Sequence, residues 1–299
     1  MKIGVIMGGI SSEREISLKS GEQVIKNLNR NKYKKIIPII INSKKEVIEK
    51  VKEIDFAFIA LHGRFGEDGT IQAVLETMGI PYSGCGVLCS AISMNKGLTK
   101  QLLMSKGIET APWITVKSVK DIDYEKISDI GYPIVIKPNN GGSSIATFLI
   151  NNECEVECAV KKVLEYDDEV MIEKYIEGTE ITSFILNGEV FPTVVIKANM
   201  GEFFDYKSKY EENGANEEVS FLDKELQKSI NKISKSIWDV LGCKSYARID
   251  MIISNNIPYF LEINTLPGMT ESSLIPKSAR ARGYNFSELL DMIIEYSLT

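Results

Sequence analysis

One predicted β-hairpin constrains the fold most, because each of its two apolar strands carries polar side chains at alternate positions. The strand YARIDMII places Arg248 and Asp250 on one face, since alternate residues of a strand share a face. The strand YFLEIN does the same with Glu262 and Asn264. Antiparallel pairing about Asn256 then brings Asp250 opposite Glu262. Arg248 comes opposite Asn264.

Two carboxylates in this arrangement need a cation. Their Cβ atoms would lie about 5 Å apart, and like charges directly opposite each other repel. A buried carboxylate is tolerated when it is paired or bound to a metal, and hard oxygen ligands of this kind suit Mg²⁺. We therefore predict that Asp250, Glu262 and Asn264 are metal ligands. The alternative is a hairpin held by an ion pair of Arg248, which leaves Asn264 without a role.

The first 91 residues predict a parallel sheet covered by helices. Strand-like runs alternate with helix-like runs, which are KIGVIMGG, SSEREISLKSGEQVIKNL, KIIPIII, KKEVIEKVKEI, DFAFIAL and TIQAVLETMG. Functional groups of such sheets lie at the carboxyl ends of the strands. Glu13 follows the first strand, and His62 follows the third in the loop LHGRFGEDG. A structural histidine held by loop hydrogen bonds is the alternative for His62.

Two further units follow, an α+β domain over residues 92–178 and a third domain over 179–299. In the second unit, the segment VIKPNNGGSSI places Lys137 at the end of a strand, before a glycine loop whose N–H groups can approach phosphate oxygens. Lys96 in SMNKGLTK adds to a phosphate site, although a flexible hairpin loop is the alternative. Glu173 ends one strand and Glu180 begins the next. A segment that connects two domains is a natural nucleotide pocket, whereas either glutamate alone could be a solvated surface residue.

The overall composition narrows the classes of partner. The net charge is −6 without a long basic stripe, so nucleic acid is an unexpected partner. The early apolar runs are much shorter than the roughly 20 residues that cross a bilayer. We see no signal peptide and expect a cytoplasmic protein. The five cysteines include two pairs spaced four apart, and free thiols are a better interpretation than metal ligands.

The chain resembles the ATP-grasp ligases in four features taken together. These are the strand lysine, the glycine and serine loop, the two linker glutamates and the predicted metal-binding hairpin. Within them, the chain resembles the family of D-alanine:D-alanine ligases along almost its full length. The segments that carry this resemblance are GGISSEREISL, LHGRFGEDG, IEKYIEGTEIT, FFDYKSKY, YARID and EINTLPGMTESSLIP. The resemblance implies an ATP-grasp fold preceded by an N-terminal parallel-sheet domain. It also implies a homodimer that makes D-alanyl-D-alanine for peptidoglycan from ATP and two D-alanine molecules.

The resemblance also implies roles for individual residues. Those implied for the nucleotide are Lys96, Lys137, Ser143, Ser144, Glu173, Lys174, Ile176 and Glu180. Two Mg²⁺ ions, which Mn²⁺ could replace, would be held by Asp250, Glu262 and Asn264. The first D-alanine would contact Glu13, His62, Arg248 and the N–H of Gly268, and the second would contact Lys209, Ser273 and Leu274. Tyr210 and Ser143 would link a mobile loop back to Glu13.

The chain departs from the family pattern at a few positions. Asn140 and Gly141 stand where many members carry larger charged residues, Ala146 stands where glycine is common, and DYKSKY lacks the usual alanine before Lys209. These departures predict looser loop closure with the chemistry retained. The alternatives are another ATP-grasp ligase that joins a carboxylate to an amine, a D-alanine:D-lactate ligase, and a nucleotide-binding protein without turnover.

Overall fold

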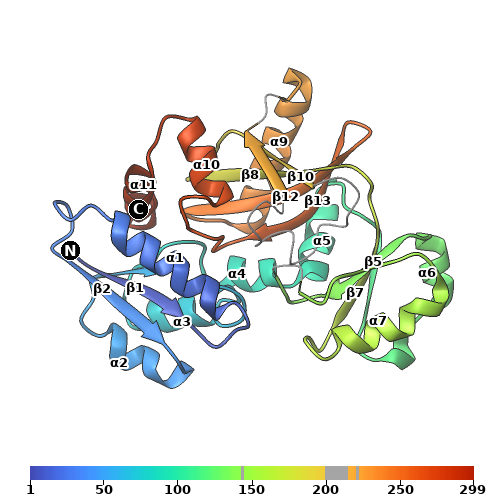
Figure 1. Cartoon of the computed structure of the whole chain (residues 1–299), viewed down its shortest axis with the longest axis horizontal. Helices are drawn as coiled ribbons and strands as arrows, with labels where there is room; N and C mark the ends of the chain where they lie inside the picture. The colour runs from blue at the N-terminus through green and yellow to red at the C-terminus, as the bar shows by residue number, and fades with distance from the viewer. Residues whose placement is uncertain (143–144, 199–214, 220–221) are drawn as a thin grey trace.

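A computed structural model describes residues 1–142, 145–198, 215–219 and 222–299. Within these residues the strands form three sheets, and in Figure 1 the third sheet in chain order lies between the first, at the left, and the second, at the right. The first sheet is parallel, with strand order β2-β1-β3, as the sequence predicts. Its elements are β1 (Lys2–Gly8), α1 (Arg14–Asn27), β2 (Lys35–Ile41), η1 (Lys44–Glu46), α2 (Val47–Val51), β3 (Phe56–Ile59) and α3 (Thr70–Thr77).

The second sheet is antiparallel, with strand order β4-β7-β5-β6. Two helices lead from the first sheet into it, α4 (Val87–Met94) and α5 (Lys96–Met104). The remaining elements are β4 (Trp113–Val116), η2 (Val119–Asp121), α6 (Tyr124–Ile130), β5 (Ile134–Pro138), β6 (Phe148–Ile150), η3 (Glu153–Glu155), α7 (Val156–Val163) and β7 (Val170–Lys174). Leu103 of α5 packs in the core of the third sheet, and Lys100 of the same helix lies against Trp113 of β4, so α5 contacts both sheets.

The third sheet follows the path β11-β10-β8-β12-β13, and β9 pairs with β8. Its elements are β8 (Thr179–Leu186), β9 (Glu189–Val190), β10 (Val194–Ala198), β11 (Ala215–Val219), α9 (Lys224–Leu241), β12 (Tyr246–Ser254) and β13 (Ile257–Asn264). The helix α9 shows why such elements form. Asp223 caps its first turn, residues at helical spacing such as Ile230, Ile237 and Leu241 are buried, and Gly242 ends it at a φ of 63°.

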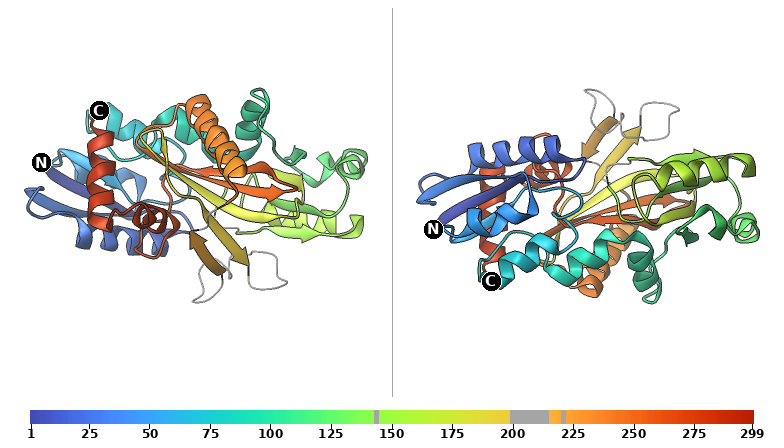
Figure 2. Two further views of the ribbon diagram at one scale, coloured as in Figure 1. Left: turned by 90° about the horizontal axis from the view of Figure 1, so that it is seen from above. Right: turned by 90° about the horizontal axis from the view of Figure 1, so that it is seen from below.

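The C-terminal helices return to the first sheet. They are α10 (Leu274–Ala281) and α11 (Phe286–Ser297), and α11 begins with a capping box formed by Asn285 and Glu288. Leu289 and Ile293 share one apolar core with Ile3 of β1, and Figure 2 shows the red C-terminal helices lying against the blue N-terminal part. The two ends of the chain are therefore packed together.

The hairpin of β12 and β13 has the predicted pairing at its functional end. Asp250 lies opposite Glu262, and Arg248 lies opposite Asn264. The turn itself is made by Asn255 and Asn256, both at positive φ. A register shift next to Asp250 separates this turn from the polar end of the hairpin. The bulge therefore decides which residue faces Asp250.

Ala146 sits in a left-handed backbone conformation at a φ of 53°. An L-residue pays about 1 to 2 kcal/mol in this region, whereas glycine does not. We therefore expect Ala146→Gly to stabilise the fold by about 1 kcal/mol, as measured by urea unfolding. Ala159→Gly, in the buried face of α7, is the control and should destabilise. A loss of stability in Ala146→Gly would contradict the assignment of strain.

Candidate active site

A cavity between the second and third sheets gathers many of the predicted nucleotide residues. Its lining includes Lys96, Lys137, Glu173, Lys174, Ile176, Glu180 and Glu262. The rest of the lining is largely apolar and comes from both sheets, for example Val135 of β5 and Ile252 of β12. An apolar pocket with a few convergent charges is typical of a nucleotide site. Ser143 and Ser144, and also Lys209 and Tyr210, lie outside the described residues.

Glu173 is the electrostatic centre of this cavity. It is buried, and its carboxylate accepts hydrogen bonds from the ammonium groups of Lys100 and Lys137. Burial alone would raise the pKa of Glu173, but the two ammonium groups outweigh it and lower the pKa to about 2. Glu173 therefore stays ionised and holds Lys137 in place. Lys100, which sequence analysis missed, is also buried and lies 5.0 Å from the centre of the Trp113 ring.

Lys96 connects the glycine loop to the hairpin. It begins α5, and its ammonium group donates to the carbonyl of Gly141 and lies 3.3 Å from a carboxylate oxygen of Glu262. Asn139 fixes this arrangement, because its side-chain oxygen accepts from the N–H of Gly97 at 2.8 Å. Its carbonyl also accepts from the N–H of Lys96 at 3.0 Å. Asn139 was missed because an asparagine in a glycine loop also suits an ordinary turn.

The polar end of the hairpin is tightly bonded. Asp250 accepts from Arg248 Nη2 at 2.7 Å and from Asn264 Nδ2 at 3.0 Å, and it also accepts from the hydroxyl of Thr182. The ion pair of the alternative interpretation is thus present, and Asn264 takes part in it. Asp250 is buried, while Glu262 faces it across the strand pair. Two carboxylates and an amide therefore lie together at this end of the hairpin, and Glu262 also lines the cavity.

The residues after β1 and β3 meet at a second place. Glu13, His62 and Glu67 bring their ligand atoms within 4.8 Å of one another. The ring of His62 bonds to Leu266 O at 2.9 Å and to Ser20 Oγ at 3.0 Å, and burial lowers its pKa to about 4. Both ring nitrogens of the neutral histidine are thereby used within the protein. His62 joins the loop after β3 to the loop after β13.

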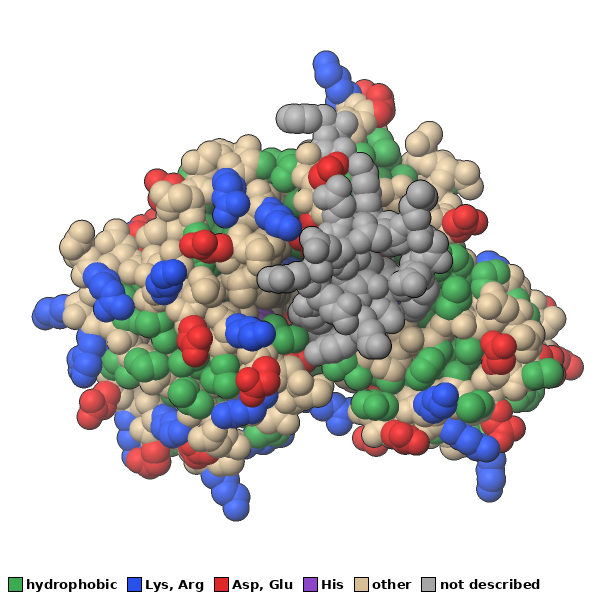
Figure 3. All heavy atoms as spheres, in the orientation of Figure 1, with side chains coloured by type: hydrophobic (Ala, Val, Ile, Leu, Met, Phe, Trp, Pro, Cys, Tyr) green, Lys and Arg blue, Asp and Glu red, His purple; other side chains and the backbone are tan. Residues whose placement is uncertain are grey.

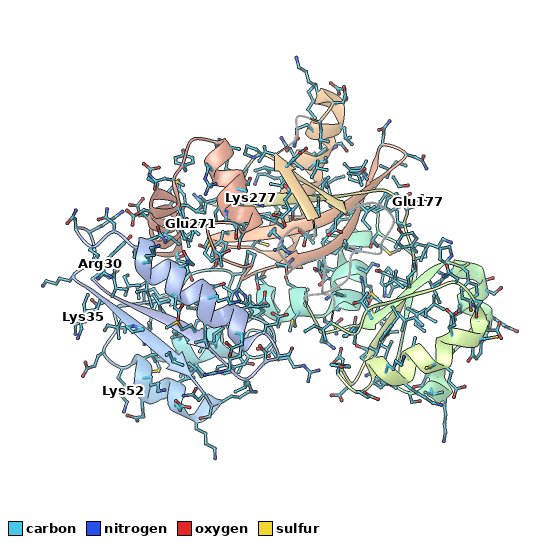
Figure 4. The ribbon with its side chains drawn as sticks, viewed as in Figure 1. Arg30, Lys35, Lys52, Glu177, Glu271 and Lys277 are labelled. Carbon is cyan, nitrogen blue, oxygen red and sulfur yellow. The ribbon has the colours of Figure 1, made fainter. Side chains whose placement is uncertain are left out.

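The loop after β13 carries the remaining predicted residues. Gly268 lies in this loop, and Ser273 directly precedes α10, which begins with Leu274. The hydroxyl of Ser273 accepts from the N–H of Thr270 at 3.0 Å, which closes the turn before the helix. Figure 4 labels Glu271 and Lys277 near this end of α10, and Glu177 farther to the right.

Glu13 also approaches the glycine loop. A Cβ atom added to Gly142 would lie 3.2 Å from Oε1 of Glu13. A second link joins the same two parts, because Arg64 donates to the buried carboxylate of Asp167 at 2.6 Å. Asp167 in turn accepts from the backbone N–H of Asn140 at 2.7 Å. The N-terminal part is therefore anchored to the root of the glycine loop.

Glu67 is a site residue that sequence analysis did not single out. Burial, together with the negative charge of Glu13, raises the pKa of Glu67 to about 8. Its carboxyl accepts from the N–H of Gly63 at 2.7 Å. Glu67 is therefore largely protonated at neutral pH.

The raised pKa of Glu67 predicts a pH dependence of stability. The native state binds the proton more tightly than the unfolded state, so the stabilisation is complete below about pH 4.5 and is lost as the pH rises through about 8. Glu67→Gln removes this dependence. Between about pH 6 and 8, we expect the unfolding free energy of Glu67→Gln to rise relative to that of the parent by up to about 1.4 kcal/mol per pH unit. Exposed Glu49→Gln is the control, and parallel curves for parent and Glu67→Gln would contradict the prediction.

The surface fits a small-molecule site. On the face shown in Figure 3, acidic and basic side chains are intermixed over the N-terminal part. Arg30, Lys35 and Lys52 point outward from that part in Figure 4. Among the residues that the structure describes, no helix has both the length and the apolar composition needed to cross a membrane.

Comparisons with known proteins agree with this geometry. Two family profiles match, "D-ala D-ala ligase N-terminus" over residues 2–49 and 42–85 and "D-ala D-ala ligase C-terminus" over residues 102–295. The D-alanine--D-alanine ligase of Clostridium perfringens (strain SM101) is 55% identical over 298 residues, which cover 100% of this chain and 98% of that protein. The ligase of Clostridium beijerinckii is 54% identical over 299 residues, with coverage of 100% and 99%.

A solved structure is similar to this chain in fold as well as in sequence. The D-alanine--D-alanine ligase of Bacillus anthracis complexed with ATP is 45% identical and superposes with a TM-score of 0.89, covering 100% of this chain and 97% of that one. The profiles, the relatives and the fold agree over nearly the whole chain. The chain belongs to the D-alanine:D-alanine ligase family.

Proposed function

We propose that this protein joins two D-alanine molecules into D-alanyl-D-alanine and converts ATP to ADP and phosphate. The dipeptide would serve as a precursor of peptidoglycan. The observation that carries the proposal is the convergence of Lys96, Lys137 and Glu262 in one cavity between two sheets. Membership in the D-alanine:D-alanine ligase family supplies the substrates. We further propose that the protein acts in the cytoplasm as a homodimer.

The cavity suggests how ATP would lie. We assign Lys96 and Lys137 to the phosphates, because both residues line the cavity and the ammonium group of Lys96 bonds to Gly141 of the glycine loop. We assign Ser143 and Ser144 to the same phosphates. Lys174 and Ile176 would border the adenine, and Glu180 would accept from the ribose hydroxyls. Glu173 would act indirectly, since its carboxylate is already bonded to Lys100 and Lys137.

The polar end of the hairpin suits two Mg²⁺ ions. All three candidate ligands can offer oxygen, which is the donor that Mg²⁺ prefers. In this structure cationic side chains compensate the two carboxylates, with Arg248 on Asp250 and Lys96 near Glu262. Asn264 presents its NH₂ group to Asp250, and rotation of the amide would present its oxygen instead. Bound Mg²⁺, or Mn²⁺ in its place, would neutralise charge on the phosphate oxygens during transfer.

The residues on the substrate side fit an acyl phosphate mechanism. A carboxylate is a poor electrophile, so its oxygen must first receive the γ-phosphoryl group of ATP. The amine of the second D-alanine then attacks the acyl carbon, phosphate leaves with the carboxylate oxygen, and the amine loses a proton. Arg248 and the N–H of Gly268 would stabilise the negative charge that develops on the other oxygen.

The remaining residues would orient the two substrates. Glu13 would accept a charge-assisted hydrogen bond from the ammonium of the first D-alanine. Lys209, Ser273 and Leu274 would seat the second. Tyr210 and Ser143 would link back to Glu13 and exclude water. His62 would keep the two substrate loops together, because both of its ring nitrogens bond within the protein.

An isotope experiment tests the order of bond making. D-alanine labelled with oxygen-18 in its carboxylate, mixed with ATP and Mg²⁺, is expected to yield labelled inorganic phosphate and ADP. Attack on the γ-phosphorus requires this result, because one carboxylate oxygen leaves with the phosphate. Label in AMP, with release of pyrophosphate, would instead establish adenylate chemistry. Unlabelled phosphate would contradict the acyl phosphate even if the dipeptide formed.

A further inference from the structure

The three buried cysteines of the chain lie together. Cys85 precedes α4, Cys89 is in its first turn, and Cys243 follows α9. Their sulfur atoms all lie within 4.8 Å of one another, and Cys89 Sγ is 3.6 Å from Cys243 Sγ. The other two cysteines, Cys154 and Cys158, are exposed. The fold thus joins cysteines that are more than 150 positions apart in the sequence.

The spacing suits one metal ion between three sulfurs. A Zn–S bond is about 2.3 Å, so two sulfurs on one tetrahedral ion lie about 3.8 Å apart. The cluster therefore needs only small movements of the side chains to bring all three sulfurs to bonding distance. The metal-type ligands of this cluster are all sulfur. Such a set favours soft or borderline cations over Mg²⁺ or Ca²⁺.

The cluster lies in a largely apolar environment. All three cysteines belong to an apolar core that also contains Ile181 and Leu241. Cys89 lies near the N-terminus of α4, where backbone N–H groups stabilise negative charge. The N-terminus of α4 therefore favours an anionic sulfur ligand at this position.

We propose that Cys85, Cys89 and Cys243 form a binding site for a single thiophilic d¹⁰ cation of the Zn²⁺, Cd²⁺ or Cu⁺ class. Each thiol that binds the ion gives up its proton to solvent. The S–H of Cys85, which now donates toward the carbonyl oxygens of Lys244 and Tyr246 at 3.5 and 3.6 Å, is replaced in this way by a bond to the metal. No electrons are exchanged in this step.

The proposed site would link two segments, the start of α4 and the start of β12, that lead into the candidate active site. Figure 1 shows α4 between the N-terminal sheet and α5, and α5 begins with Lys96. Cys243 lies three residues before Tyr246, the first residue of β12, which carries Arg248 and Asp250. A bound ion would therefore tie the start of α4 to the root of β12. Because it binds the folded chain preferentially, it should also raise the melting temperature.

The experiment measures Cd²⁺ binding to the full chain. Cys154→Ser and Cys158→Ser are introduced first, because these substitutions remove the exposed thiols. We expect one Cd²⁺ per chain after gel filtration, together with sulfur-to-cadmium charge-transfer absorption in the ultraviolet and a higher melting temperature. Adding Cys243→Ser should weaken binding by more than about 100-fold, because one of three ligands is lost. Cys89→Ser in the same background is the second test, and circular dichroism checks that each variant is folded.

Several outcomes would overturn the proposal. Failure of the variant without Cys154 and Cys158 to retain Cd²⁺ is one such outcome. Undiminished Cd²⁺ affinity in a folded Cys243→Ser or Cys89→Ser variant is another. If Cd²⁺ is not retained but hydrogen peroxide oxidises Cys89 and Cys243 to a disulfide, with reduction of peroxide to water, the cluster is a redox pair and not a metal site. The test does not depend on ligase activity, so it stands apart from the proposed function.

Discussion

Glu173→Gln is expected to destabilise the folded chain by about 3 to 5 kcal/mol, which is the usual cost of leaving a buried charge without its partner. Glu173 is the shared anion of Lys100 and Lys137, and all three side chains are buried. Glutamine keeps the shape of the side chain but removes the charge. Two ammonium groups would then face each other in an apolar setting. Lys137 should then move from its position, and the phosphate contact assigned to it should be lost.

Urea unfolding of the parent and the variant measures this loss. Glu177→Gln, four residues along in an exposed position of the same segment, is the matched control and should change little. Adding Lys100→Met to Glu173→Gln should recover part of the stability, because it removes one of the two unpaired charges. No recovery would mean that packing, and not charge, explains the loss.

The lowered pKa of Glu173 gives this prediction a pH signature. The stabilisation is complete above the pKa of the unfolded carboxyl, near 4.5, and is lost as the pH falls through about 2. The difference between parent and Glu173→Gln should therefore shrink on acidification through this window. A difference that stays constant down to about pH 2.5 would contradict the electrostatic explanation.

The pairing predicted for the polar end of the hairpin was correct, but the prediction did not include the register shift on which this pairing depends. Pairing about Asn256 gives the observed partner of Asp250, but the structure turns at both Asn255 and Asn256 and then shifts register beside Asp250. Without that shift, the turn would place Leu261 opposite Asp250. Alternation identified the polar face, whereas a bulge has no reliable signal in a single sequence.

The first sheet was predictable because strands and helices alternate with clear periodicity. The pairing of Glu173 with two lysines was not predictable from the sequence. Lys100 is one of many lysines, and only the fold brings it to Glu173, which is 73 residues away in the sequence. The same holds for the ion pair of Arg64 with Asp167, which joins two separate sheets. Local pattern reveals which face of an element is polar, but partners distant in sequence come from tertiary packing.

The cysteines show the same limit in another form. Spacing within the sequence pairs Cys85 with Cys89 and Cys154 with Cys158, so the two pairs look alike. The structure separates them, because the first pair is buried against Cys243 and the second is exposed on and beside α7. None of the five cysteines forms a disulfide in this structure.

Asp250→Asn is expected to lower turnover by about a thousandfold, which corresponds to about 4 kcal/mol of the activation barrier. The substitution keeps the size of the side chain and removes the charge that would hold Mg²⁺ at the triphosphate. It also removes the negative charge that Arg248 Nη2 contacts at 2.7 Å in the parent. Glu262→Gln should act in the same direction, because Glu262 lies directly opposite.

Steady-state rates of phosphate release at limiting and excess Mg²⁺ measure this effect, and excess Mg²⁺ should restore a little activity in either variant. Asp239→Asn, in an exposed ion pair with Lys235, is the surface control. Thr182→Val is the sharper comparison, because it removes a hydrogen bond to Asp250 and leaves the carboxylate charged. Its effect should be far smaller than that of Asp250→Asn if charge at the metal site is decisive. Turnover of Asp250→Asn equal to that of the parent at limiting Mg²⁺ would rule out the metal assignment of the hairpin, because an amide cannot replace the carboxylate as an anionic ligand.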